Sequence, residues 1–276
     1  MTTIEIDAHE LTRAARALAH AGRWSGAIRL LDAARRTGGA EPGIALAAAE
    51  VALESDWYAG TAHAEARLRH PALAHADVWD VGFLRLRAAY RALLFDRGTF
   101  RPGPAGRDPR VIEALAADAD RLEDQAEDGV RRGWARFYRG LIDDNLAGRR
   151  DAAPARYRSA LGTGDDLLER EALRHLGDHD HDAGDHDAAR SRWEHATALG
   201  ARAGAVTGTL SQQLLLAVLH RDAGDEAAAT ALGREVARWA TALGATRLAA
   251  TAGAFLAGTD PTAATGRQEG LTESEI

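Results

Sequence analysis

One segment of the chain gathers side chains that could bind a metal ion, the stretch RHLGDHDHDAGDHD at 174–187. His175 and His179 stand four residues apart, a spacing that puts both imidazoles on one side of a helix. The other titratable side chains fan round the helix and cannot all converge: Asp178, His181, Asp182 and His186. A third ligand would have to come from another helix, with Asp143 or Asp144 the nearest candidates. Because such a stretch is also typical of a solvated turn, we expect no bound metal or cofactor.

A second group of polar side chains lies in GLIDDNLAG at 140–148. Asp144 is expected at an inward-facing helix position, as is Asp180 in the next copy of the pattern. A buried carboxylate is costly unless it is paired. Either Arg139 or Arg174 pairs with such a carboxylate, which would mark a functional site, or the helices are rotated and the carboxylates are hydrated.

Two further polar residues invite a chemical interpretation. Asn145 is the only asparagine of the chain. Its amide could clamp a backbone or a ligand, or it could satisfy the last turn of its own helix. Asp144 and His175, facing each other across adjacent helices, would form a general acid–base pair. No serine lies in a Gly-x-Ser-x-Gly motif, which leaves nucleophilic catalysis without support. An enzyme is therefore the lesser expectation.

The composition excludes several classes of chemistry. The chain has no lysine and no cysteine, so it offers no P-loop lysine, Schiff base, thiolate nucleophile or disulfide. Its formal charge of -7 argues against a general nucleic-acid partner. No stretch approaches the ~18 consecutive apolar residues of a membrane span, and the N-terminus lacks a basic, apolar leader. We expect a cytoplasmic protein with no nucleic-acid or membrane partner.

Internal repeats organise the rest of the chain. HDAGDHDAAR at 181–190 and RDAGDEAAAT at 221–230 share Asp-Ala-Gly-Asp followed by paired alanines, 40 residues apart. The same frame fits NLAGRRDAAPARY at 145–157 and AHAGRWSGAIRLLDAA at 19–34. A repeat of this length is typical of stacked helix pairs, in which small residues let the helices approach closely.

The frame resembles the tetratricopeptide repeat (TPR) family, whose unit has a Leu-Gly pair, a turn glycine and a second helix with small and aromatic residues. The clearest copy places these at Leu176, Gly177, Gly184, His186, Ala189, Trp193 and Ala196. The first copy has Gly22, Trp24, Ala27, Leu31 and Ala34. The resemblance implies an all-α fold, a right-handed α-solenoid of about six antiparallel helix pairs.

The predicted domain is a single repeat domain over 1–257. It divides into divergent repeats at 8–127, clearer repeats at 131–243 and a capping helix at 246–257. The expected helices lie near 8–21, 25–37, 43–54, 57–70, 73–95, 109–127, 131–147, 151–161, 166–183, 186–202, 208–223, 226–243 and 246–257. Trp57 is expected in a turn between helices. The stretch at 96–109, rich in Pro and Gly, is an ordered excursion or a mobile loop, and we expect a disordered tail at 258–276.

The resemblance also implies a binding surface, because the first helix of each TPR pair faces a concave groove. Carried over by the turn glycines, the expected groove residues are Tyr138, Arg139, Asp144, Asn145, Glu171, Arg174, His175, Asp178 and His181. The expected function is an interaction module that holds a partner protein or peptide in this groove. The alternative is a small-molecule sensor or enzyme with a polar pocket formed by helices 131–147 and 166–183.

Overall fold

The computed structural model describes residues 6–38, 41–96 and 98–262, and this part of the chain is almost entirely helical. The elements in order are α1 (Ala8–His20), α2 (Trp24–Gly38), α3 (Pro42–Tyr58), α4 (Ala64–Leu68), the 3-10 helix η1 (Pro71–His75), α5 (Val78–Leu94), β1 (Phe95–Asp96), β2 (Thr99–Phe100), α6 (Pro109–Asp124), α7 (Gly129–Asn145), α8 (Ala153–Arg158), α9 (Asp166–Asp182), α10 (His186–Arg202), α11 (Val206–Asp222), α12 (Glu226–Leu243) and α13 (Thr246–Leu256). The expected all-α class is confirmed.

The repeated Asp-Ala-Gly-Asp motif forms the turn between the helices of a pair. Ala183 ends α9, and Gly184 follows with φ +79°, a left-handed conformation that favours glycine. Asp185 then caps α10, since its carboxylate accepts a hydrogen bond from the Ala188 backbone amide at 3.0 Å. The second copy of the motif, at 222–225, repeats the arrangement between α11 and α12.

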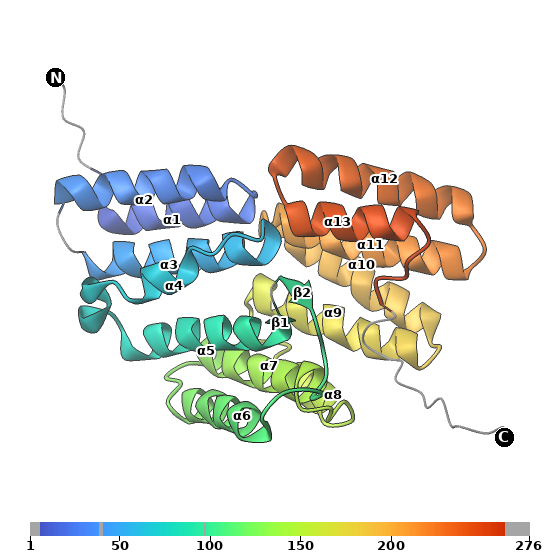
Figure 1. The fold of residues 1–276 in the computed structure, drawn as a ribbon, viewed down its shortest axis with the longest axis horizontal. Coiled ribbons are helices and arrows are strands. Elements are labelled where there is room, and N and C mark those ends of the chain that lie inside the picture. The colour runs from blue at the N-terminus through green and yellow to red at the C-terminus, as the bar shows by residue number, and fades with distance from the viewer. Residues whose placement is uncertain (1–5, 39–40, 97, 263–276) are drawn as a thin grey trace.

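Helices that follow one another in the sequence also pack against one another, and the two ends of the row meet (Figure 1). The Thr246 hydroxyl at the start of α13 donates to the Ala59 carbonyl at the end of α3, at 2.8 Å. The guanidinium of Arg247 lies 4.1 Å from the centre of the Phe95 ring. One hydrophobic cluster contains buried side chains from α1, α2 and α3 together with others from α11, α12 and α13. The helix at 246–257 therefore covers α12 and also contacts the N-terminal helices.

The second helix pair differs from the prediction. Trp57 does not lie in a turn, because α3 continues to Tyr58 and only then reaches Gly60, whose φ of +68° ends the run. The expected helix at 57–70 is reduced to the five residues of α4. The expected helix at 73–95 begins at Val78, since Asp77 caps it. Within α3 no residue after the first turn breaks the helix before Gly60. The predicted break between residues 54 and 57 was therefore wrong.

The Pro- and Gly-rich stretch after α5 is an ordered excursion in the residues that the structure describes. β1 and β2 form a short antiparallel hairpin that pairs Phe95 with Phe100. Arg107 then fastens the loop, because its guanidinium donates to the Leu93 carbonyl at 2.8 and 3.0 Å. Most of the tail predicted at 258–276 lies outside the described residues.

Candidate functional site

Charged and phenolic side chains from five helices line one face of the molecule's interior, which we call the interior polar surface. It consists of Arg16 and His20 on α1, Glu50, Glu54 and Tyr58 on α3, Arg87 on α5, Tyr138 on α7, and Arg170, Glu171 and Arg174 on α9. Each of these helices is the first of a pair in the repeat frame. The surface carries both signs of charge, as the contact of Arg16 with Glu50 at 2.7 Å illustrates.

Two arginines of α9 dominate the centre of this surface. Arg170 is buried and contacts Glu171, and its Nε atom has no hydrogen-bond partner. The close approach of α10 and α11 encloses its side chain, because a Cβ atom on Gly208 would overlap the guanidinium. Arg174 keeps 32% of its side chain exposed and makes a long 3.6 Å contact with Asp178. The pair combines one fixed, buried cation with one cation that remains accessible.

Tyr138 and Asn145 belong to the same part of the molecule but differ in their roles. Tyr138 packs edge-on against Phe83 and Tyr90, with ring centroids 5.3 and 5.7 Å apart. Asn145 is buried, and its amide donates to the Tyr90 hydroxyl at 3.0 Å. The asparagine therefore joins α7 to α5 through its side chain.

Asp144 is nearly buried and has three partners. The Tyr157 hydroxyl donates to it at 3.0 Å, His179 Nε2 lies at 3.0 Å, and Arg150 Nε lies at 3.4 Å. Neither Arg139 nor Arg174, the partners considered from the sequence, pairs with this carboxylate, because Tyr157 and Arg150, which follow α7 in the chain, contact its oxygens. Asp180, 23% exposed, pairs with Arg192.

The sequence allowed an acid–base pair of His175 with Asp144, but in the structure Asp144 has other partners. The His175 ring stacks on Tyr157, 5.1 Å between centroids, while the carboxylate binds His179 instead. Burial, together with the charge of Arg174, lowers the pKa of His175 well below its usual value. The packed rings of His175 and Tyr157 contribute to the contact between their helices.

Arg139 lies away from the interior polar surface. Its guanidinium contacts Asp143 one turn along α7 at 2.5 Å and Asp120 of α6 at 3.0 Å. It therefore joins α7 to α6, the second helix of the preceding pair. Arg139, which the sequence placed among the groove residues, does not contribute to the interior polar surface, since neighbouring positions of a helix differ in direction by ~100°.

The remaining predicted residues lie along the C-terminal half of α9. Asp178 is close to Arg174 and to His175 Nδ1, both at 3.6 Å. His181 Nε2 contacts Asp222 of α11 at 2.8 Å, and its ring packs on Trp193 at 5.6 Å. The nearby carboxylates of Asp182 and Asp222 outweigh burial and raise the pKa of His181 to about 9. His181 thus belongs to the turn region and not to the centre of the interior.

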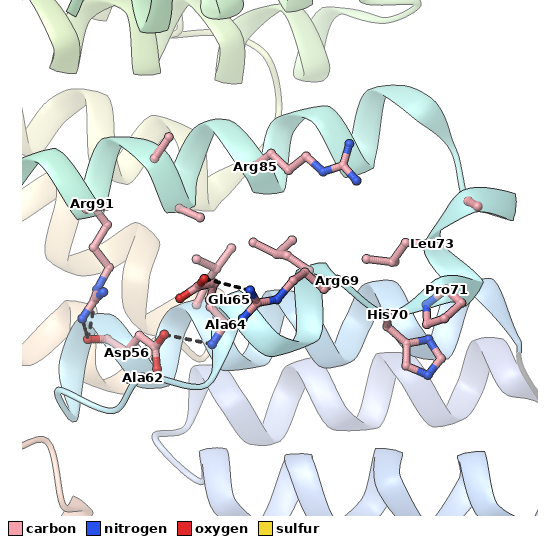
Figure 2. Close-up of a pocket in the computed structure, with 16 residues that line it drawn as sticks. Asp56, Ala62, Ala64, Glu65, Arg69, His70, Pro71, Leu73, Arg85 and Arg91 are labelled. Atoms are coloured by element: carbon pink, nitrogen blue, oxygen red, sulfur yellow. Dashed lines mark hydrogen bonds and ion pairs between the residues drawn. The ribbon is translucent and has the colours of Figure 1, made fainter. Parts of the chain in front are cut away.

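The structure also contains a cleft that the sequence did not predict (Figure 2). It has a volume of about 910 Å³ and opens between α5 and the short α4–η1 segment, with α3 behind it. Alanines and leucines form much of its lining, and Arg69, Arg85 and His70 are among its polar side chains. Asp56 fixes its end, since it accepts backbone hydrogen bonds at the start of α4. The cleft exists because α4 is too short to cover α3 and α5. In the sequence, Pro71 is the residue that could have indicated this early helix end.

Glu54 should make stability depend on pH. Burial raises the pKa of Glu54 to about 7 from 4.5, the charge of Glu50 adds to the shift and Arg87 opposes it. The folded state therefore binds more protons than the unfolded state between these pH values, and stability falls as pH rises through them. Because the side chain is 19% exposed, we expect Glu54→Gln to add ~1–3 kcal/mol at pH 8 and little near pH 4.5.

Chemical denaturation of both proteins at pH 4.5 and pH 8 measures this difference. Glu113→Gln, at an exposed position on α6, serves as the matched control. An equal gain from Glu54→Gln at both pH values would show that the surroundings do not raise the pKa of the Glu54 carboxyl.

Comparison with known proteins found no relative of this chain. No family model, curated protein or solved structure matches the chain. Within the described residues, no helix has the length and apolar character needed to cross a membrane. Function must therefore be argued from the side chains of this chain and their arrangement.

Proposed function

We propose that the chain is a cytoplasmic, TPR-like interaction module that binds a segment of a partner protein along the interior polar surface. In this proposal the helix pairs form a right-handed α-solenoid, with the first helix of each pair facing inward. The repeated turns at 182–185 and 222–225, which have the same geometry, support the repeat arrangement.

The observation that carries the proposal is the convergence of partly exposed charges from different first helices. Arg174, Glu171 and Glu50 keep 32%, 24% and 27% of their side chains exposed. Holding partly buried charges costs solvation free energy, which a bound polar ligand can return. Interior packing alone would be better served by apolar side chains.

The mixture of charges favours a peptide over a uniformly charged ligand. Arg87, Arg170 and Arg174 alternate with Glu54 and Glu171, so an anionic polymer would meet repulsion as well as attraction. A peptide supplies donors, acceptors and side chains of both signs within a short length. Tyr58 and Tyr138 add flat surfaces of the kind enriched at binding sites. We infer that Arg174 is the anchor, because its guanidinium is both central and accessible.

Selection from a random displayed peptide library tests the proposal without knowledge of the natural partner. We expect peptides to be enriched, and Arg174→Ala to weaken the best of them at least about tenfold, or ~1.4 kcal/mol. Arg234→Ala, at an exposed position on α12, is the matched control and should leave the affinity unchanged. Failure to enrich any peptide, or equal effects of the two variants, would contradict the proposal.

A small-molecule ligand is the second candidate, and the cleft beside α5 favours it. A volume of about 910 Å³ lies within the usual range for ligand sites, and an apolar lining with a few charged groups is typical of them. Arg69 and Arg85 would select an anionic group. Between α7 and α9, by contrast, Tyr157 fills the space next to Asp144 and His175. Native mass spectrometry of protein from its own cells would detect such a ligand as a bound mass that denaturation releases.

A further inference from the structure

Three side chains that could bind a metal ion meet at the turn between α9 and α10. His181 Nε2 lies 2.8 Å from the Asp222 carboxylate at the end of α11. The His186 ring at the start of α10 stacks on His181, with centroids 5.1 Å apart and planes 13° apart. One potential ligand atom from each residue lies within 4.8 Å of the other two. Together they form a cluster of two imidazoles and one carboxylate, which we call the turn cluster.

The repeat itself brings the turn cluster together. Asp182 and Asp222 occupy the same position of the motif in consecutive copies, 40 residues apart. Stacking of consecutive helix pairs therefore sets the Asp222 carboxylate beside the residue that precedes Asp182, which is His181. His186 reaches the same place from the other side of the turn, since Gly184 reverses the chain between them.

The surroundings of His181 restrict its ring. Its side chain is only 12% exposed, and Trp193 packs against the ring at 5.6 Å. Its second ring nitrogen, Nδ1, is buried, has no hydrogen-bond partner, and lies 3.9 Å from Asp182. Asp182 is fixed in turn by Arg150 at 2.5 Å. A small rotation of the ring would bring Nδ1 within hydrogen-bond distance of this carboxylate, and such a partner orients a ligating histidine and strengthens the metal bond.

We propose that His181, His186 and Asp222 bind a divalent transition-metal ion of the Zn²⁺ type, with water in the remaining position. A tetrahedral ion with bonds of about 2.0 Å needs ligand atoms ~3.3 Å apart. The contact of His181 with Asp222 would therefore open by ~0.5 Å, and the exposed His186 ring would rotate toward the ion. Imidazole ligands favour Zn²⁺, Co²⁺ or Ni²⁺ over Ca²⁺ and Mg²⁺, which prefer oxygen.

A bound ion would fasten two consecutive helix pairs at their turns. The three ligands come from α9, α10 and α11, so the ion would add a cross-link where the metal-free protein has one His–Asp contact and a ring stack. An ion that binds only the folded state raises the melting temperature with its concentration. This inference is independent of the peptide-binding proposal, because the turn cluster lies outside the interior polar surface.

Calorimetric titration of tag-free protein with Zn²⁺ at pH 8 tests the proposal. We expect one equivalent to bind and the melting temperature to rise. Titration with Co²⁺ should give visible absorption bands of a low-coordinate nitrogen and oxygen site. His186→Ala and Asp222→Asn should each weaken Zn²⁺ binding at least about tenfold. Both positions are exposed, and circular dichroism would verify that the variants fold.

His195→Ala is the matched control, since His195 is an exposed histidine on the same helix as His186. It should bind Zn²⁺ as the wild type does. Absence of Zn²⁺ binding by the wild type, or equal binding by wild type and His186→Ala, would overturn the proposal. Loss of binding in His179→Ala with retention in His186→Ala would place the ion at the histidine pair four residues apart and would also overturn it.

Discussion

Gly177→Val is expected to lower the stability of the protein by ~3 kcal/mol or more, because α9 and α10 touch at this glycine. A Cβ atom there would overlap the pyrrole side of the Trp193 indole, which is fully buried. The indole cannot move outward without losing the hydrogen bond that its Nε1 donates to the Arg174 carbonyl at 3.0 Å. Overpacking and a lost buried hydrogen bond therefore act together.

Thermal and chemical denaturation followed by circular dichroism would measure the loss. Gly253→Ala on α13 is the matched control, since no atom lies within 4 Å of the position of its Cβ. That change should be neutral or stabilise slightly, by up to ~1 kcal/mol, because alanine favours helix more than glycine does. If Gly177→Ala, the smallest enlargement, proved as harmless as Gly253→Ala, the close contact of the two helices would be refuted.

The same contact links stability to the proposed binding surface. Trp193 holds the backbone at Arg174, and Arg174 lies one turn before the glycine on the same helix. A displaced indole would shift the guanidinium relative to Tyr138 and Glu171. We therefore expect the folded fraction of Gly177→Ala to bind selected peptides more weakly than the wild type.

Local features of this fold could be read from the sequence because single residues determine them. The Asp-Ala-Gly-Asp motif specified a helix end, a left-handed glycine and an N-cap, and the structure has all three at Gly184 and Asp185. The sequence also predicted the small residues Ala189 and Gly177 that meet the next helix, and both are buried. Such features depend on contacts within about one repeat, which a motif encodes directly.

The arrangement of distant helices could not be read in the same way. The contact between α3 and α13 joins residues almost 190 positions apart, and no motif marks Ala59 or Thr246 as partners. The cleft beside α5 forms because α4 ends after five residues. Small differences in helix stability decide where such a helix ends. Long-range packing of this kind is the sum of many weak preferences, none of which is visible at one residue.

The candidate site shows the same division. Tyr138, Glu171 and Arg174 were predicted and contribute to the interior polar surface, because the repeat frame identifies the helices that face inward. The frame did not identify Glu54 or Arg87, because they lie in divergent copies of the repeat. It also did not identify Arg170, because this residue occupies a different position on α9 from the predicted groove residues. Asn145 was recognised as unusual, yet its partner Tyr90 could only come from the three-dimensional arrangement.

Asp143→Ala is expected to cost ~3–5 kcal/mol, because it removes a buried anion that pairs with two arginines. The Asp143 side chain is 3% exposed, and its Oδ1 atom contacts Arg139 at 2.5 Å and Arg149 at 2.8 Å. An arginine guanidinium stays protonated in proteins, so Arg139 would keep its charge when its partner is lost. The Arg139 side chain is 14% exposed, and Asp120 would then be its remaining carboxylate partner.

Asp120→Ala is the matched control, because Asp120 and Asp143 contact the same Arg139 guanidinium. Asp120 is 49% exposed, and its removal should cost less than ~1 kcal/mol. Asp143→Asn should fall between the two alanine variants, since the amide oxygen still accepts a hydrogen bond while the charge is gone. Chemical denaturation of the three variants at one pH gives the order. Equal losses for Asp120→Ala and Asp143→Ala would mean that burial does not strengthen the ion pair of Arg139 with Asp143.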